Sequence, residues 1–352
     1  MPENRKKIGW IVPRGTVELT GTQTGSNLAS VRYRALIPMR ELAARGHEVT
    51  LMPIDAQTPL DNLDALGRLD TLVLSKNRDI LDLHGIDLLG VDLHGQIIDR
   101  VRARGGKIVY DLCDDQFDDP VRGPQFLSRI HQADAVVAAT ASLADTVAAR
   151  AGRTATTIAD PFEGPKGAAR WAPGTDRLNV LWFGHWSNLD TLEALIPELL
   201  DFGARRPLQL TVVTITGNDL RQEFKQFNQR HRHQLSLRYV RWSVEATWNA
   251  LVQTDVVVIP QWTDRRAQLA KSPNRLVESF RAGRFVVANP IPAYREFGEW
   301  AAITDRISDG LEWAMTHQGL IQPRIAKAQD YIEAHYSPRV IADQWENVLT
   351  RL

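Results

Sequence analysis

A short apolar run, Asp255-Val256-Val257-Val258-Ile259-Pro260, decides the fold of this chain. A strand that is apolar on both faces fits a parallel sheet covered by helices on both sides. Similar runs around it fit further strands at Asn179–Gly184, Gln209–Ile215, Leu237–Arg241 and Phe285–Asn289. Longer stretches of helical period separate them, and the chain is helical throughout after Asp305. This alternation predicts a parallel α/β domain.

The same alternation runs through the first half of the chain. Strands fit Ile8–Pro13, Glu48–Pro53, Thr71–Ser75, Lys107–Leu112, Ala135–Ala139 and Thr156–Ala159. Helices fit 29–45, which Gly46 would end, and also 88–104, 125–132 and 143–151. A stretch rich in Pro and Gly, Asp160–Arg177, breaks the rhythm and is typical of an interdomain linker. Two α/β domains with a cleft between them are therefore expected.

Bulk composition narrows the function classes. The length of 352 residues favours two domains, and 42 Lys plus Arg balance 42 Asp plus Glu, so no global charge recruits nucleic acid. The single cysteine, Cys113, excludes an internal disulfide framework and fits a reducing cytoplasm. The apolar run near the start is too short for a signal peptide, and none approaches the roughly 20 residues of a membrane span. We expect a cytoplasmic protein and leave peripheral membrane contact open.

The segment from Lys271 to Ala288 carries the strongest functional signal. Ser272 is placed to cap a helix with Pro273 at its first position. The apolar side chains Leu276, Val277 and Phe280 would face the core, and Asn274, Glu278 and Arg281 the other side. A helix N-terminus beside Lys271 attracts phosphate, and Glu278 could accept hydrogen bonds from ribose hydroxyls. The alternative is a surface helix with a solvated polar face.

This segment resembles the donor-binding signature of GT-B glycosyltransferases, in particular the large retaining family that uses nucleotide sugars. Glu278, the Ala282-Gly283 turn and Val286-Val287 match that signature. The beginning of the first long helix (residues 30–34), the turn at residues 182–185, and Tyr336-Ser337-Pro338 before a final helix also resemble the family. The resemblance implies two Rossmann-like domains with parallel sheets facing across a cleft. It implies an N-terminal acceptor-side domain at 1–163, a linker at 164–177, a nucleotide-sugar domain at 178–335, and a terminal helix at 336–352 that crosses back.

The resemblance also assigns site residues. The donor would be held by Gly184, His185, Lys271, Ser272, Asn274, Arg275 and Glu278, with Glu278 on the ribose. Two features depart from the family pattern: Ala270 stands where a first glutamate is common, and the basic pair that usually binds the diphosphate is not evident. Lys271 or Arg275 would supply the missing positive charge.

On the acceptor side we single out a loop and a pair of carboxylates. The loop from Arg14 to Asn27 carries Gly15, Gly25 and Ser26 and suits close approach to a ligand, while Arg32 and Arg34 could bind an acidic acceptor or be solvated. Asp111 and Asp114, after a strand, could orient an acceptor hydroxyl or act as base; acidic loops without a role are also common. Together with His185 and Lys271 they form the catalytic candidates. No metal site and no cofactor besides the nucleotide sugar are expected.

The sequence therefore predicts a glycosyltransferase that moves a sugar from a nucleotide-diphosphate donor to an unidentified saccharide, lipid-linked or small-molecule acceptor. Retention of configuration is implied by the resemblance alone. Two alternatives remain open: a nucleotide-sugar epimerase of the same fold, and a degenerate binding or scaffold protein that keeps the fold without catalysis. Fold alone does not choose among them.

Overall fold

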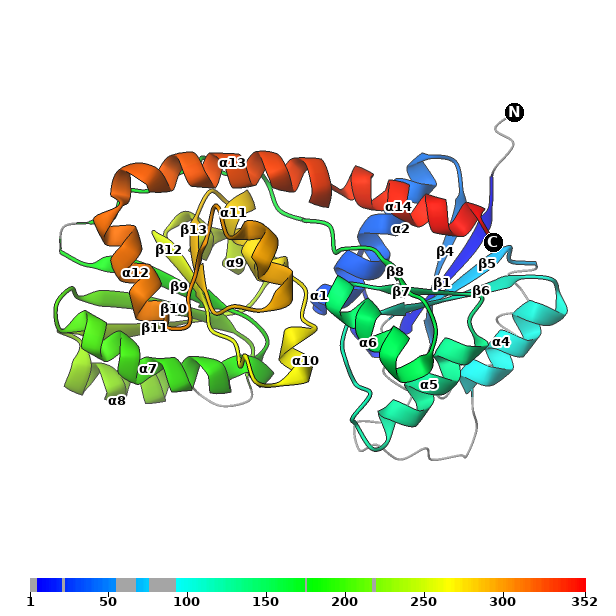
Figure 1. Cartoon of the computed structure of the whole chain (residues 1–352), viewed down its shortest axis with the longest axis horizontal. Helices are drawn as coiled ribbons and strands as arrows, with labels where there is room; N and C mark the ends of the chain where they lie inside the picture. The colour runs from blue at the N-terminus through cyan, green and yellow to red at the C-terminus, as the bar shows by residue number, and fades with distance from the viewer. Residues whose placement is uncertain (1–4, 21–22, 55–67, 76–92, 175, 217–219) are drawn as a thin grey trace. The chain divides into compact units, whose positions relative to one another are not determined.

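The computed structural model describes residues 5–20, 23–54, 68–75, 93–174, 176–216 and 220–352. The chain divides into two compact units (Figure 1). The first consists of Met1–Pro161, Ala270–Ser272 and Tyr336–Leu352, and the second of Phe162–Leu269 and Pro273–His335. Each unit contains a parallel sheet of six strands.

The first unit has the strand order β4-β1-β5-β6-β7-β8. Its strands are β1 (Lys7–Pro13), β4 (Glu48–Ile54), β5 (Thr71–Ser75), β6 (Lys107–Leu112), β7 (Ala135–Ala138) and β8 (Thr156–Thr157), with a β2–β3 hairpin (Glu18–Thr20, Gln23–Gly25). Its helices are α1 (Ala29–Val31), α2 (Ile37–Ala44), α4 (Leu93–Ala103), α5 (Arg122–Gln132), α6 (Ala141–Ala151) and α14 (Pro338–Thr350). The expected helix at 88–104 lies partly outside the described residues.

Alternate residues of each strand in the first unit enter two separate cores, one on each face of the sheet. Val73, Val109 and Val137 pack with α2 and α14, where Trp345 lies edge-on to Trp10 at 4.8 Å between ring centroids. Their strand neighbours, such as Leu72 and Tyr110, pack with α4, α5 and α6 on the other face. This double burial explains why the strands read as continuous apolar runs.

The expected first long helix is interrupted in the structure. A π-helix at Arg32–Leu36 separates α1 from α2. Gly46, with φ of 96°, follows the end of α2 as expected for a helix-terminating glycine. Leu36, Met39 and Leu42 are buried and form the inward side of this segment.

The second unit has the strand order β11-β10-β9-β12-β13-β14, the doubly wound order of a dinucleotide-binding sheet. Its strands are β9 (Leu178–Phe183), β10 (Leu208–Thr214), β11 (Leu235–Arg241), β12 (Val256–Ile259), β13 (Phe285–Ala288) and β14 (Ala302–Ile303). Its helices are α7 (Leu189–Gly203), α8 (Leu220–His231), α9 (Val244–Val252), α10 (Arg266–Leu269), α11 (Asn274–Arg281), α12 (Ile307–Thr316) and α13 (Gln318–Tyr336). In this unit α7 and α8 cover one face of the sheet and α9 and α11 the other (Figure 1).

The stretch expected to be a linker is packed within the second unit. The N–H of Gly167 donates to the Arg281 carbonyl at 2.8 Å, and the N–H of Arg170 donates to the Gly283 carbonyl at 3.1 Å. The Gln329 side chain donates to the Gly167 carbonyl at 2.8 Å. Its glycines permit this close packing, because a Cβ at Gly167 would stand 2.3 Å from the Ala282 carbonyl oxygen.

Candidate functional site

The candidates of the second unit gather at the carboxyl edge of its sheet, between β9 and β12. The strand order reverses there, because β10 lies on one side of β9 and β12, which comes later in the chain, lies on the other. Open α/β sheets bind ligands beside such a reversal. Gly184 follows β9 directly, and Gln261 follows β12 after one residue. Both loops therefore begin at the place where a ligand is expected.

Asp190, in the first turn of α7, connects the segment after β9 to the loop after β12. Its Oδ2 accepts a hydrogen bond from Trp262 Nε1 at 2.7 Å and lies 3.2 Å from Arg265 Nη1. The Arg265 guanidinium also stacks over the Trp262 ring, 4.5 Å from its centroid. Asn188 is the N-cap of α7, and its side chain makes no capping bond.

Arg275 brings a cation to this edge. It lies in the first turn of α11, and its Nη1 lies 3.5 Å from the position that a Cβ would take on Gly184. Nη1 is buried and has no hydrogen-bond partner among the described residues. Burial lowers the pKa of the guanidinium, and the Tyr294 hydroxyl opposes that shift. Arginine stays protonated in proteins, so Nη1 is a buried positive donor beside the turn after β9 and has no acceptor among the described residues.

Two further polar residues, which the sequence did not indicate as site residues, are connected to Arg275: Tyr294 interacts with it directly, and Gln261 contacts Tyr294. Tyr294 is buried, and its hydroxyl accepts a hydrogen bond from Gln261 Nε2 at 3.0 Å. The Gln261 N–H in turn donates to Asn289 Oδ1 at 3.0 Å. Gln261 was detectable, because it follows a fully apolar strand at the carboxyl edge where ligand-binding side chains collect. Tyr294 carries no such signal in the sequence.

His185 lies exposed at the same edge, directly after Gly184. Its Nδ1 is 2.8 Å from Ser187 Oγ, and its ring lies 5.3 Å from that of Trp186. Trp186 is itself 56% exposed. The ring of His185 is thus oriented by its own turn, at the place where the sequence predicts contact with a donor.

Glu278 is buried rather than placed on a polar face. Only 4% of the residue is exposed, and its Oε1 accepts a hydrogen bond from the N–H of Glu163 at 2.8 Å. This bond joins α11 to the segment that begins the second unit. The apolar prediction for α11 is confirmed, since Leu276, Val277 and Phe280 are all buried. Binding of ribose by Glu278 stays a prediction.

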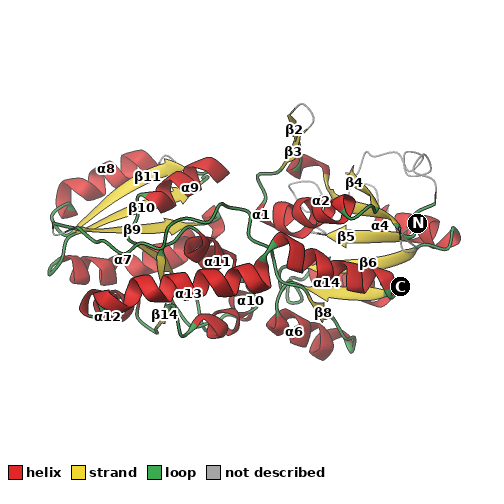
Figure 2. Cartoon of the chain, turned by 90° about the horizontal axis from the view of Figure 1, so that it is seen from above, coloured by secondary structure: helices red, strands yellow, loops and turns green. Residues whose placement is uncertain are grey.

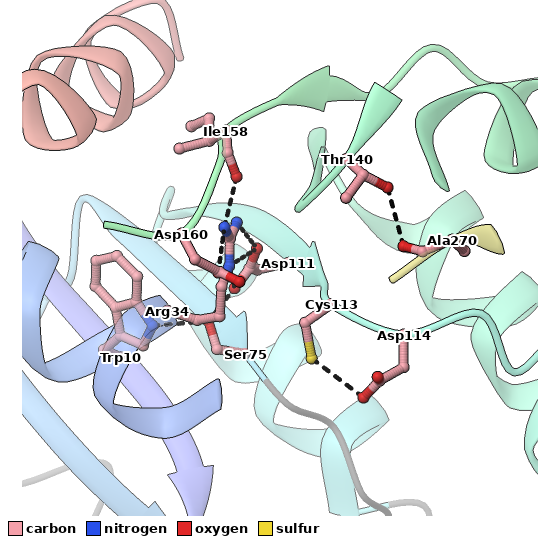
Figure 3. A network of polar contacts seen from close by, with 10 residues as sticks. All are labelled: Trp10, Arg34, Ser75, Asp111, Cys113, Asp114, Thr140, Ile158, Asp160 and Ala270. Carbon is pink, nitrogen blue, oxygen red and sulfur yellow. Dashed lines mark hydrogen bonds and ion pairs between the residues drawn. The ribbon is translucent and has the colours of Figure 1, made fainter. Parts of the chain in front are cut away.

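The beginning of α11 also differs from the expectation. Pro273 is the N-cap rather than the first helical residue, and no side chain, including that of Ser272, caps the helix. Lys271 and Ser272 belong to the first unit together with Ala270. Ala270 is 1% exposed and packs in the first unit's core, and its carbonyl accepts a hydrogen bond from Thr140 Oγ1 at 3.0 Å (Figure 3). A glutamate at position 270 would place its carboxylate in an apolar core, which explains the alanine.

In the first unit, Arg34 and Asp111 form a buried network (Figure 3). Arg34 is 1% exposed, and its guanidinium pairs with Asp111 at 2.5 Å and with Asp160 at 3.1 Å. Asp111 also accepts a hydrogen bond from Ser75 Oγ at 2.7 Å, which itself accepts one from Trp10 Nε1 at 2.8 Å. Both carboxylates raise the pKa of Arg34 against the effect of burial. The charged groups of Arg34 and Asp111 are thus buried and paired with each other, and their assignment to an acceptor stays a prediction.

The other acidic residues after β6 have local roles. Asp119 accepts hydrogen bonds from the N–H groups of Val121 and Arg122, and these bonds, that of Arg122 first, lower its pKa. Asp115 accepts one from the N–H of Phe117 at 3.1 Å. Asp114 remains half-buried, 3.5 Å from the Cys113 sulfur. Among the described residues no group of three His, Cys, Asp or Glu side chains is placed to hold a metal ion.

The predicted loop from Arg14 to Asn27 contains the β2–β3 hairpin. Ser26 is buried at its base, where it accepts a hydrogen bond from the Leu28 N–H at 3.0 Å, and Arg32 Nη1 donates to its carbonyl at 2.9 Å. Both side chains thus hold the hairpin in place. A Cβ at Gly15 would meet nothing within 4 Å, so packing does not require that glycine.

The sequence and the structure were compared with those of known proteins. No protein-family profile and no curated protein matches the sequence. A glycosyltransferase from Rickettsia africae ESF-5 is similar in structure, with a TM-score of 0.68 at 10% identity, covering 99% of this chain and 98% of that one. HepE from Anabaena, in complex with UDP and glucose, gives a TM-score of 0.67 at 13% identity and covers 99% and 100%.

Sucrose-phosphate synthase from Thermosynechococcus elongatus is also similar, with a TM-score of 0.64 at 11% identity over 99% of both chains. The fold is GT-B. The sequence predicted this GT-B architecture, and the two parallel sheets confirm it. No helix among the described residues of this GT-B chain has the length and apolar character that crossing a membrane requires.

Proposed function

We propose that this chain is a glycosyltransferase that moves a sugar from a nucleotide-diphosphate donor to an acceptor. The GT-B fold supports the proposal, since similar structures carry UDP with glucose in one case and UDP-glucose in another. The second unit would bind the donor at the reversal between β9 and β12. The epimerase and scaffold alternatives are not favoured by these neighbours.

One observation carries the proposal: the buried Nη1 of Arg275, which has no partner among the described residues, beside Gly184. Cleavage of the bond between sugar and diphosphate leaves negative charge on the diphosphate. A fixed guanidinium at that place stabilises this charge more in the transition state than in the ground state, which accelerates the reaction. Arg275 would thereby replace the basic pair that the family usually carries.

The remaining residues take roles around this cation. Glu278 would bind the ribose through the carboxylate that also holds Glu163, and Asn274 and His185 would contact the phosphates or the sugar. Lys271 and Ser272 stay donor candidates from the adjacent chain segment. On the acceptor side we retain Asp114, Gly15 and Gly25. The proposal assigns charge neutralisation to Arg275 and needs no divalent metal.

The test is thermal stability of the purified protein against UDP, GDP, ADP, TDP and their common sugars. A nucleotide held at 100 times its dissociation constant should raise the free energy of unfolding by about 2.7 kcal/mol. Arg275→Gln should abolish this effect, and Arg295→Gln, an exposed arginine of the same unit, should preserve it. An equal nucleotide effect in Arg275→Gln, or none in the unmodified protein, would overturn the proposal.

Turnover is then assayed with the nucleotide sugar that stabilises the protein. Transfer to saccharide, lipid-linked or small-molecule acceptors supports the glycosyltransferase. Conversion of the donor to its epimer without acceptor, or binding without any turnover, would identify one of the two alternatives.

A further inference from the structure

A basic groove lies in the second unit, and neither Gly184 nor Arg275 lines it. Its lining residues come from α8, from the residue that follows α8, and from β11, an edge strand of the sheet. Figure 2 shows α8 next to β11. Its volume is about 430 Å³, within the range of roughly 300–1,000 Å³ that is usual for ligand sites. The residues that line it are Arg221, Phe224, Lys225, Asn228, Gln229, Arg232, Leu237 and Tyr239. None of these residues is acidic.

The cations of the groove form a row. Arg221 and Lys225 are four positions apart on α8, which places them on one face of the helix. Arg232 directly follows His231, the last residue of α8. Lys225 and Arg232 are exposed and form no ion pair within the described part of the chain. Their charges are therefore available to a ligand.

The charge is concentrated here although the whole chain is neutral. From residue 220 to residue 241 there are six Lys or Arg residues and one acidic residue, Glu223, which does not line the groove. A field of this kind attracts anions. Packing of α8 does not explain this concentration of positive charge, because Leu220 is the one buried side chain of the helix.

The groove is held in shape without a ligand. Asn228 Nδ2 donates to the Leu237 carbonyl at 2.9 Å, and the Leu237 N–H donates to Asn228 Oδ1 at 2.7 Å. These two hydrogen bonds between the Asn228 side chain and the backbone of β11 hold the helix against the strand. A preformed site loses less freedom on binding.

The geometry points to an anionic saccharide, bearing sulfate, phosphate or carboxylate groups along its chain, as the ligand of this groove. A row of cations matches such charges, and Gln229 and the partly exposed ring of Phe224 suit sugar hydroxyls and a sugar ring face. The inference goes beyond the proposed function and does not rest on it, since binding here requires neither a donor nor turnover.

Two other anionic partners fit less well. Single-stranded nucleic acid needs open aromatic faces for stacking, but the Tyr239 ring is overlaid by the Arg221 guanidinium at 5.8 Å and its hydroxyl is bonded to the Thr214 carbonyl. A membrane surface favours exposed apolar side chains beside the cations. Within the described part of the chain, the exposed large apolar residues lie outside α8 and β11; they are Val121, Trp186, Ile215, Val252 and Leu320.

The test is binding of a heparin-derived sulfated oligosaccharide, measured by titration calorimetry on the full chain at low and at physiological salt. Lys225→Ala/Arg232→Ala should weaken binding at least tenfold. The control Arg295→Ala/Lys327→Ala removes two exposed cations of the same unit and should leave affinity within twofold. Neutral maltooligosaccharides should not bind.

Circular dichroism and the nucleotide effect on stability should be unchanged in the groove variant, which separates this site from the donor site. Equal affinity of the groove and control variants for the sulfated oligosaccharide would overturn the proposal. A short oligothymidine, or phosphatidylglycerol vesicles, that bind through Lys225 and Arg232 while the sulfated oligosaccharide does not would overturn it as well.

Discussion

At the scale of single residues, Arg34 shows how a buried charge shapes the first unit. Its guanidinium holds Asp111 and Asp160, and it lies over the Trp345 ring at 5.6 Å from the centroid. Arg34→Met would leave two buried carboxylates without a positive partner, so we expect a loss of about 3–5 kcal/mol in the free energy of unfolding. Urea denaturation measures it. The exposed Arg40→Met serves as control and should cost less than about 1 kcal/mol; similar losses for both variants would contradict this role of Arg34.

Glu278 offers a second test at this scale, because its two functions separate. Glu278→Gln keeps an oxygen that can accept from the Glu163 N–H but removes the charge, whereas Glu278→Ala removes both. If the carboxylate binds ribose, Glu278→Gln should keep the thermal stability of the free protein and weaken nucleotide binding about tenfold, or about 1.4 kcal/mol. Isothermal titration with the stabilising nucleotide measures this. Unchanged affinity in Glu278→Gln would leave Glu278 a purely structural residue.

The residue scale is also where sequence reasoning had least reach. The partners of Arg34 lie 77 and 126 positions away in the chain. No spacing rule connects them, so Arg34 and Asp111 were assigned to an acceptor instead of to each other. Arg275 was found because it lies within a recognisable motif. Its burial against Gly184, and the support from Tyr294, depend on packing that the sequence does not display.

At the scale of elements, the turn between α11 and β13 requires a glycine at position 283. Gly283 has φ of 78°, and a Cβ on it would stand 2.0 Å from the Ala168 carbonyl oxygen. Gly152 also has a positive φ, of 62°, but nothing lies within 4 Å of its Cβ position. Gly152→Ala should therefore cost about 1–2 kcal/mol for the backbone alone, and Gly283→Ala clearly more. Thermal denaturation ranks the two; an equal cost would show that the Ala168 segment gives way.

Elements with a clear apolar pattern were predictable, and polar or very short ones were not. The strands of both sheets lie within two residues of their expected ends, except β14, which contains only Ala302 and Ile303. Helix α8 is mostly polar, with Leu220, Phe224 and Phe227 as its large apolar side chains, and its bounds were not predicted. The π-helix at 32–36 was missed as well, because a change in helical hydrogen bonding leaves no mark on the spacing of apolar residues.

Glu346 on helix α14 is expected to make the stability of the protein depend on pH. Glu346 accepts hydrogen bonds from Arg45 and His47, in that order of effect, and they lower its pKa. A depressed carboxylate pKa adds stability that is present above its unfolded pKa and is lost as the pH falls through the folded value. Since 35% of the side chain is exposed, the gain is below about 1 kcal/mol. Denaturant titrations between pH 7 and acid should show a smaller pH dependence for Glu346→Gln than for the unmodified chain; identical curves would exclude the contribution.

At the scale of the whole molecule, the C-terminal segment of the chain belongs to the same unit as the N-terminal segment. Tyr336–Leu352 lies in the first unit, and Ile341, Trp345, Val348 and Leu349 of α14 enter the core that contains β1 and α2. The first unit is thus assembled from segments far apart in the sequence, and its core is incomplete without Tyr336–Leu352. The second unit has its own buried strands and does not use α14 in its core.

Trp345→Ala should therefore weaken the two units unequally. Removing a fully buried tryptophan that touches Trp10 is expected to cost the first unit about 3–5 kcal/mol, while the second unit retains its stability and its response to nucleotides. Limited proteolysis with mass spectrometry should then cleave the variant within residues 5–161 first and leave fragments of the second unit protected. Asn347→Ala, an exposed change on the same helix, should be cleaved like the unmodified protein. Simultaneous cleavage of both units in Trp345→Ala would mean that they unfold as one cooperative body, and that the core around Trp345 supports the second unit as well.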